Sequence, residues 1–81
     1  MSFGEKLRGL RKAKGAACTQ AMVGEAVGMS QKKISRLERD TFEPSLYDLV
    51  LLCKYYQVSA DFLLGLPEGL SYPSEADFAQ E

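Results

Sequence analysis

The segment from residue 20 to residue 37 constrains the fold of this chain more than any other. Its apolar residues recur at helical spacing on either side of a glycine: Val23, Val27, Met29, Ile34 and Leu37. Residues three or four apart share one face of a helix, so the first pair and the last pair define two inward faces. Gly28 can adopt the positive φ that ends a helix, and Gly24 lets two helices approach closely. The spacing predicts two short helices joined by a tight turn.

The second of these helices has one side that the apolar pattern leaves free. At about 100° per residue, an arc of about 140° carries an amide, a hydroxyl and cations but no acid: Gln31, Ser35, Arg39, Lys32 and Arg36. Glutamine and arginine form paired hydrogen bonds with adenine and guanine edges in the major groove of DNA. The alternative is the solvated face of an ordinary amphipathic helix. The accompanying pattern of Gly24, Gly28 and Ile34 favours the interpretation that this arc contacts DNA bases.

From Phe3 to Gly65 the chain resembles the helix-turn-helix domain of the lambda-repressor and Cro family, also called Xre-like regulators. The segments that carry the resemblance are GEKLRGLRKAKG, TQAMVGEAVGMSQKKISRLERD and PSLYDLVLLCKYYQVSADFLLG. The resemblance implies an all-α, compact five-helix fold in which the second and third helices form the helix-turn-helix. It also implies a sequence-specific regulator of transcription, a dimeric repressor that places its third helix in the major groove of a palindromic operator.

The resemblance assigns roles to individual residues. It implies that DNA bases are read by Gln31, Lys32, Arg36, Lys33 and Ser35. It implies that phosphates are held by Gln20, Ser30 and Arg39, with Gln20 also orienting Gln31. It implies a structural ion pair between Arg11 and Glu38, although a direct phosphate contact by Arg11 is an alternative.

The chain departs from the family pattern in three places. The link at residues 16–18 is about two residues longer than usual. Asp40 and Gln57 stand where glycine is common, and Phe42 and Glu43 occupy a loop that is usually basic. This last change removes cations that would contact phosphate.

The net charge of −1 is unevenly divided along the chain. Residues 1–41 hold nine Lys or Arg against four acids, whereas residues 42–81 hold one Lys against seven acids. Such asymmetry is typical of a domain that presents one side to phosphate.

We expect a DNA-binding domain over residues 1–65 and an acidic tail over 66–81 that is either disordered or part of a dimer interface. Helices are predicted over 3–14 and after Thr19, after Ser30, after Ser45 and after Ser59. The fourth helix is expected to bury Leu46, Leu49, Val50 and Cys53, and the fifth to contribute Phe62 and Leu63. In the tail, Ser74 and Asp77 would start a short helix that carries Phe78.

A second apolar stripe on the fourth helix comprises Tyr47, Leu51 and Tyr55. We interpret it as the surface of a homodimer, with coverage by the tail as the alternative. An antitoxin or protein-interaction module, which would bind a toxin or antirepressor through this stripe, is the second functional class.

The remaining features exclude other classes. We expect no enzyme, because no nucleophile stands with a base and no carboxylate pair or cofactor loop is present. Two cysteines without a C-x-x-C pair, and no histidine, predict no metal site and no cofactor. A thiol switch at Cys18 is a minor alternative. The absence of a long apolar run or signal sequence predicts a cytoplasmic protein without membrane contact.

Overall fold

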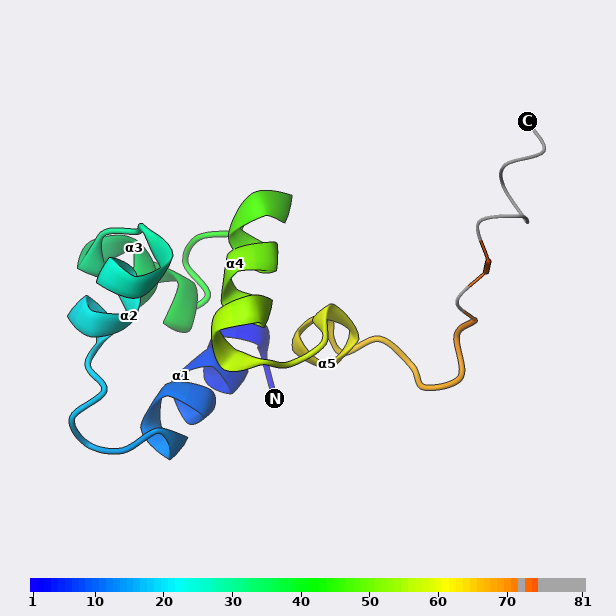
Figure 1. Cartoon of the computed structure of the whole chain (residues 1–81), viewed down its shortest axis with the longest axis horizontal. Coiled ribbons are helices and arrows are strands. Elements are labelled where there is room, and N and C mark those ends of the chain that lie inside the picture. The colour runs from blue at the N-terminus through cyan, green and yellow to red at the C-terminus, as the bar shows by residue number, and fades with distance from the viewer. Residues whose placement is uncertain (72, 75–81) are drawn as a thin grey trace.

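The computed structural model describes residues 1–71 and 73–74, and over these residues the chain is all-α, as predicted (Figure 1). The helices are α1 (Phe3–Ala13), α2 (Gln20–Val27), α3 (Gln31–Glu38), α4 (Leu46–Tyr56) and α5 (Ala60–Leu64). In Figure 1, α2 and α3 lie together beside α4, and after α5 the chain runs away from the helices. The helix expected to carry Phe78 lies outside the described residues. Among the described helices, none has the length and apolar character needed to cross a membrane.

Local capping residues set the start of every described helix. The N-caps are hydroxyl side chains that accept a hydrogen bond from the third helical residue: Ser2, Thr19, Ser30, Ser45 and Ser59. In α1 and α4, Glu5 and Asp48 return a hydrogen bond to the cap and complete a capping box. All five predicted starts are therefore confirmed.

A residue with positive φ redirects the chain after each of the five described helices, and three of these positions bear on the sequence predictions. Gly28 ends α2 with a φ of 75°, as the sequence predicts. Asp40, just after α3, and Gln57, the cap of α4, have φ values of 59° and 55° although neither is glycine. Glycine is common at these two positions in the family because glycine adopts a positive φ without steric cost. In this chain Asp40 and Gln57 adopt the same backbone conformation with a steric cost.

All five described helices contribute to the core, and α3 packs against α1 and α2 within it. Its most buried members are Leu7, Val23, Ile34, Leu37, Leu52 and Leu63. Gly24 makes the α2–α3 crossing possible, because a Cβ on it would lie 2.5 Å from the carbonyl oxygen of Met29. Gly4 does the same for α1, since a Cβ there would lie 2.6 Å from the carbonyl oxygen of Leu37. The close approach at Gly24 is as predicted, and that at Gly4 was not foreseen.

The predicted buried face of α4 is only partly correct. Leu49 is buried and Cys53 packs against the core, as predicted. Leu46 and Val50 are exposed, however, and Leu52 and Tyr56 enter the core in their place. Phe62 of α5 is likewise half-exposed, whereas Leu63 is buried as expected. The error arises because α4 is apolar on nearly all sides, so spacing alone leaves its rotation undetermined.

Both cysteines are free thiols with packing roles. Cys18 is buried, its carbonyl oxygen accepts a hydrogen bond from Arg11, and its sulfur lies 3.8 Å from the Tyr55 hydroxyl oxygen. Burial raises the pKa of the Cys53 thiol. The longer link between α1 and α2 is therefore anchored to the core through Cys18.

Candidate nucleic-acid interface

Helix α3 presents its polar arc to solvent and its apolar side to the core. Gln31, Lys32, Arg36 and Arg39 are exposed, and Ser35 is half-buried between them. Ile34 and Leu37, on the other side, are almost completely buried. The structure thus leaves four of the five arc side chains accessible to a groove.

A chain of hydrogen bonds links the core to the first residue of this arc. Arg11 donates to both carboxylate oxygens of Glu38, through Nε at 2.8 Å and Nη2 at 3.0 Å. Gln20 donates from Nε2 to Glu38 at 3.1 Å, and its own Oε1 accepts from Gln31 Nε2 at 2.9 Å. Because Glu38 is buried and held from two sides, it fixes both amides in orientation. The Gln31 side chain is therefore positioned before any ligand arrives.

The three residues assigned to phosphate contacts occupy helix ends. Gln20 opens α2 and Ser30 caps α3, where unpaired backbone N–H groups attract anions. Arg39 follows α3 and donates from Nε to the carbonyl oxygen of Ser35 at 3.4 Å, leaving the rest of its guanidinium exposed. Their placement is compatible with a DNA backbone on either side of the arc.

Lys33 differs from the other residues assigned to base reading. Its ammonium lies 2.9 Å from Asp48 Oδ2 and 5.7 Å from the centre of the Phe42 ring. Lys33 is half-buried by these contacts, which draw it toward α4 and away from the exposed arc. The sequence alone treats it as one more cation of α3, whereas the structure gives it a supporting position.

Three carboxylates make stability dependent on pH. Burial would raise the pKa of Asp48, but hydrogen bonds from Lys33 and Ser45 hold it below its usual value. Hydrogen bonds from Ser2 lower the pKa of Glu5, and those from Ser2 and Gly4 lower the pKa of Asp40.

A carboxylate with a lowered folded-state pKa stabilises the fold above its unfolded pKa, and this stability is lost as the pH falls through the folded pKa. We therefore expect the free energy of unfolding, measured with urea, to be constant near neutral pH and to fall below about pH 4. Asp48→Asn should unfold more easily by about 1–2 kcal/mol at pH 7, since Lys33 loses a charged partner. The variant should also show a shallower acid decline. An acid decline as steep as in the unaltered protein would contradict the role given to Asp48.

The stripe assigned to a dimer or partner surface is only partly exposed. Tyr47 is exposed, but Leu51 and Tyr55 pack against the core, and Lys14 lies 4.8 Å from the centre of the Tyr55 ring. The exposed apolar residues of α4 are instead Leu46, Tyr47 and Val50. This correction has the same cause as the α4 core error, since the helix is rotated from the predicted phase.

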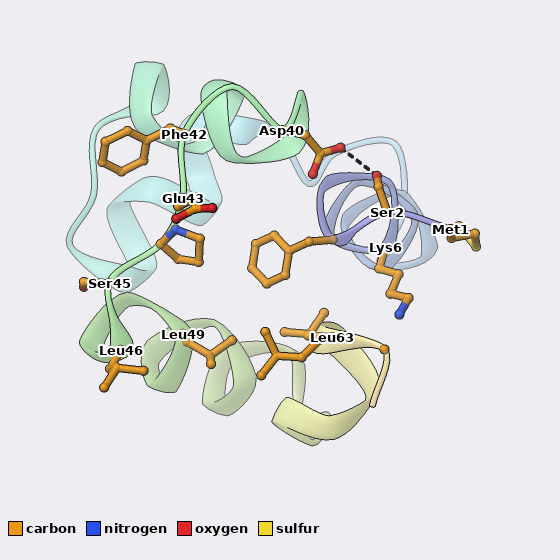
Figure 2. A pocket seen from close by; sticks show the side chains of 14 residues that line it. Met1, Ser2, Lys6, Asp40, Phe42, Glu43, Ser45, Leu46, Leu49 and Leu63 are labelled. Atoms are coloured by element: carbon orange, nitrogen blue, oxygen red, sulfur yellow. Dashed lines mark hydrogen bonds between the residues drawn. The ribbon is translucent and has the colours of Figure 1, made fainter. Parts of the chain in front are cut away.

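Leu46 also lies at the edge of a groove of about 770 Å³ between the start of α1, the α3–α4 loop, α4 and α5 (Figure 2). Leu49 and Leu63 form part of its apolar wall, and the Ser2 hydroxyl donates to Asp40 at 2.6 Å on its rim. Leu46 belongs both to the groove and to the exposed apolar residues of α4, so the two surfaces are adjacent.

Over residues 1–71 and 73–74, no three His, Cys, Asp or Glu side chains gather into a metal-binding group.

Two supporting residues were missed by the sequence analysis. Asp48 was taken only as a member of an acidic half, and Gly4 was not singled out. Asp48 had a detectable signal, since it stands three residues after Ser45 in the spacing of a capping box. Gly4 had none, because the carbonyl groups that require it come from the far end of α3.

Comparisons with known proteins agree with this geometry. The family model described as "Helix-turn-helix domain" matches residues 2–63. The transcriptional regulator ImmR of Bacillus subtilis is 35% identical over 77 residues, which cover 95% of this chain and 58% of that protein. Repressor protein C2 of Salmonella phage P22 is 41% identical over 62 residues, covering 76% of this chain and 28% of the repressor. The chain spans little more than half the length of ImmR and of a second B. subtilis regulator, YobD.

Solved structures give the same result. The P22 c2 repressor in complex with a synthetic operator superposes with a TM-score of 0.73 at 39% identity, covering 79% of this chain and 94% of that one. The restriction-modification controller protein C.AhdI of Aeromonas hydrophila gives a TM-score of 0.69 at 27% identity, covering 76% and 91% of the two chains. By its sequence match and its helical arrangement, the chain belongs to the helix-turn-helix regulators of the lambda-repressor and Cro family.

Proposed function

We propose that this protein is a sequence-specific DNA-binding regulator of transcription that inserts α3 into the major groove of an operator. We expect the protein to have no catalytic activity. Its target is a double-stranded DNA operator, and it acts in the cytoplasm. The operator complex of the similar P22 c2 repressor supports the assignment, as does the name of the controller C.AhdI.

The observation that carries the proposal is the hydrogen-bonded series from Arg11 through Glu38 and Gln20 to Gln31. A solvated polar face needs no such support, because water satisfies its amides. A base-reading glutamine gains from it, since a side chain already held in place loses less conformational entropy when it binds. We assign Gln31, Lys32 and Arg36 to base edges with Ser35 beside them, and Gln20, Ser30 and Arg39 to phosphates.

Two single substitutions test the division between reading and positioning residues. Arg36→Ala should weaken binding to the selected operator by about 1–3 kcal/mol and relax preference at one base pair. Arg39→Ala should weaken binding to operator and random DNA alike. It should also reduce the slope of log affinity against log salt concentration by about one. The measurements are dissociation constants on both duplexes at several salt concentrations.

The operator for these titrations comes from selection of a random-sequence duplex library with the unaltered protein. A protein that enriches no sequence would refute the proposed function. If Arg36→Ala and Arg39→Ala instead change operator and random DNA equally, the assignment of the two arginines is wrong while the function stands.

We also propose that the protein acts as a homodimer through Leu46, Tyr47 and Val50, the exposed apolar residues of α4. Twofold symmetry would match two half-sites about one helical turn apart. The antitoxin alternative receives no support from the similar proteins, whose names describe regulators, a repressor and a controller.

A further inference from the structure

Phe42 is an exposed aromatic residue at the edge of the reading arc. It lies in the α3–α4 loop with 44% of its surface accessible. In Figure 2 its ring points away from the side of the groove on which Leu49 and Leu63 lie. The ring therefore does not pack in the core, and it exposes apolar surface to water.

The Phe42 ring is held in place from one side. The Lys33 ammonium lies 5.7 Å from the ring centre and 2.9 Å from Asp48 Oδ2. A cation over an aromatic face stabilises that orientation, and here the cation is itself fixed by a buried carboxylate. The loop thus presents a positioned ring rather than a mobile one.

The ring borders a small hollow on the surface of α3. The hollow has a volume of about 170 Å³ and is lined by Ser30, Lys32, Lys33, Arg36 and Phe42. Two of these residues, Lys32 and Arg36, are the ones assigned to base edges. The ring therefore lies beside side chains that the proposed function places at base edges.

We propose that Phe42 is a specificity-determining residue that contacts the C5-methyl group of a thymine beside the base pair read by Lys32 and Arg36. The proposal rests on the proposed function. The thymine methyl is the apolar group that base edges display in the major groove, and apolar side chains recognise it by contact. The loop residues next to the ring carry no cation, since Phe42 stands between Thr41 and Glu43.

The test is a methyl-deletion scan of the selected operator. Each thymine is replaced in turn by deoxyuridine, which removes only the C5-methyl group, and dissociation constants are measured for the unaltered protein and for Phe42→Ala. For the unaltered protein we expect one position per half-site to lose about fourfold in affinity, the factor that corresponds to one buried methyl group. On the operator that retains this thymine, Phe42→Ala should bind about fourfold more weakly than the unaltered protein. Replacing the thymine by deoxyuridine should not weaken Phe42→Ala further.

Phe62→Ala is the matched control, because Phe62 is also a half-exposed phenylalanine that packs beside a lysine, but it lies on α5. It should respond to deoxyuridine as the unaltered protein does. The inference would be overturned if no deoxyuridine replacement lowered the affinity of the unaltered protein, or if the operator had no thymine beside the base pair read by Lys32 and Arg36. It would also be overturned if Phe42→Ala lost as much affinity as the unaltered protein on the same replacement. A loss of affinity in Phe42→Ala without any deoxyuridine effect would overturn it too, and would place the ring on a deoxyribose. All of these leave the proposed function intact, whereas the lack of any preferred operator would refute it.

Discussion

Glu38→Ala is expected to lower the free energy of unfolding by about 3 kcal/mol, because it leaves a largely buried guanidinium without its carboxylate. Arg11 has 15% of its side chain exposed and Glu38 has 3%, so water replaces little of what is lost. A domain of this size has a total stability on the order of 5 kcal/mol or slightly more, so most of it would be lost. Urea denaturation followed by circular dichroism measures the effect.

A double-mutant cycle separates the ion pair from the rest of the effect. Arg11→Met should also destabilise, because it strands the buried Glu38 carboxylate. Arg11→Met combined with Glu38→Leu should be more stable than Arg11→Met alone or Glu38→Leu alone, since the double variant leaves no unpaired charge. Additive changes in the cycle would show that the two side chains do not stabilise each other. The double variant should still bind the operator poorly, because Gln20 and Gln31 lose their anchor.

Gly24→Ala is expected to destabilise the domain by about 2–3 kcal/mol, because the added methyl overlaps a backbone carbonyl that cannot move freely. A Cβ there would lie 2.5 Å from the Met29 oxygen and 3.3 Å from the Ser30 carbonyl carbon. Both atoms belong to the turn between α2 and α3. The substitution should therefore also weaken operator binding by displacing α3.

Gly9→Ala provides the matched control for this prediction. Gly9 is exposed on α1, and a Cβ built on it has no neighbour within 4 Å. Alanine should stabilise α1 there by about 0.5–1 kcal/mol, because glycine loses more backbone entropy in a helix. If both alanine variants shift the urea midpoint in the same direction, the close approach at Gly24 does not limit stability.

The helix starts were predictable because capping is a local interaction. Ser30 accepts a hydrogen bond from Lys33 N, only three residues away, and Ser2 and Glu5 bond reciprocally across the same distance. The turn at Gly28 was predictable for a similar reason, since its left-handed backbone depends on the residue itself. Such features are complete within one helical turn of sequence.

The rotation of α4 was not predictable in this way. Its eleven residues include only two charges, Asp48 and Lys54, so several faces are apolar enough to enter a core. The ion pair from Lys33 to Asp48 and the burial of Leu52 select one of these faces. Both contacts join α4 to residues distant in the chain, which a periodicity within the helix does not encode.

The candidate site shows the same division. The sequence by itself determined where the helices begin, that α3 has one apolar and one polar side, and that Gln31, Lys32 and Arg36 share the polar side, because these follow from spacing along one helix. Only the tertiary structure decided that Lys33 turns toward Asp48 and that Leu51 and Tyr55 face the core. Those outcomes depend on how α4 packs against the other helices, and that packing is the sum of contacts between residues that lie far apart in the chain.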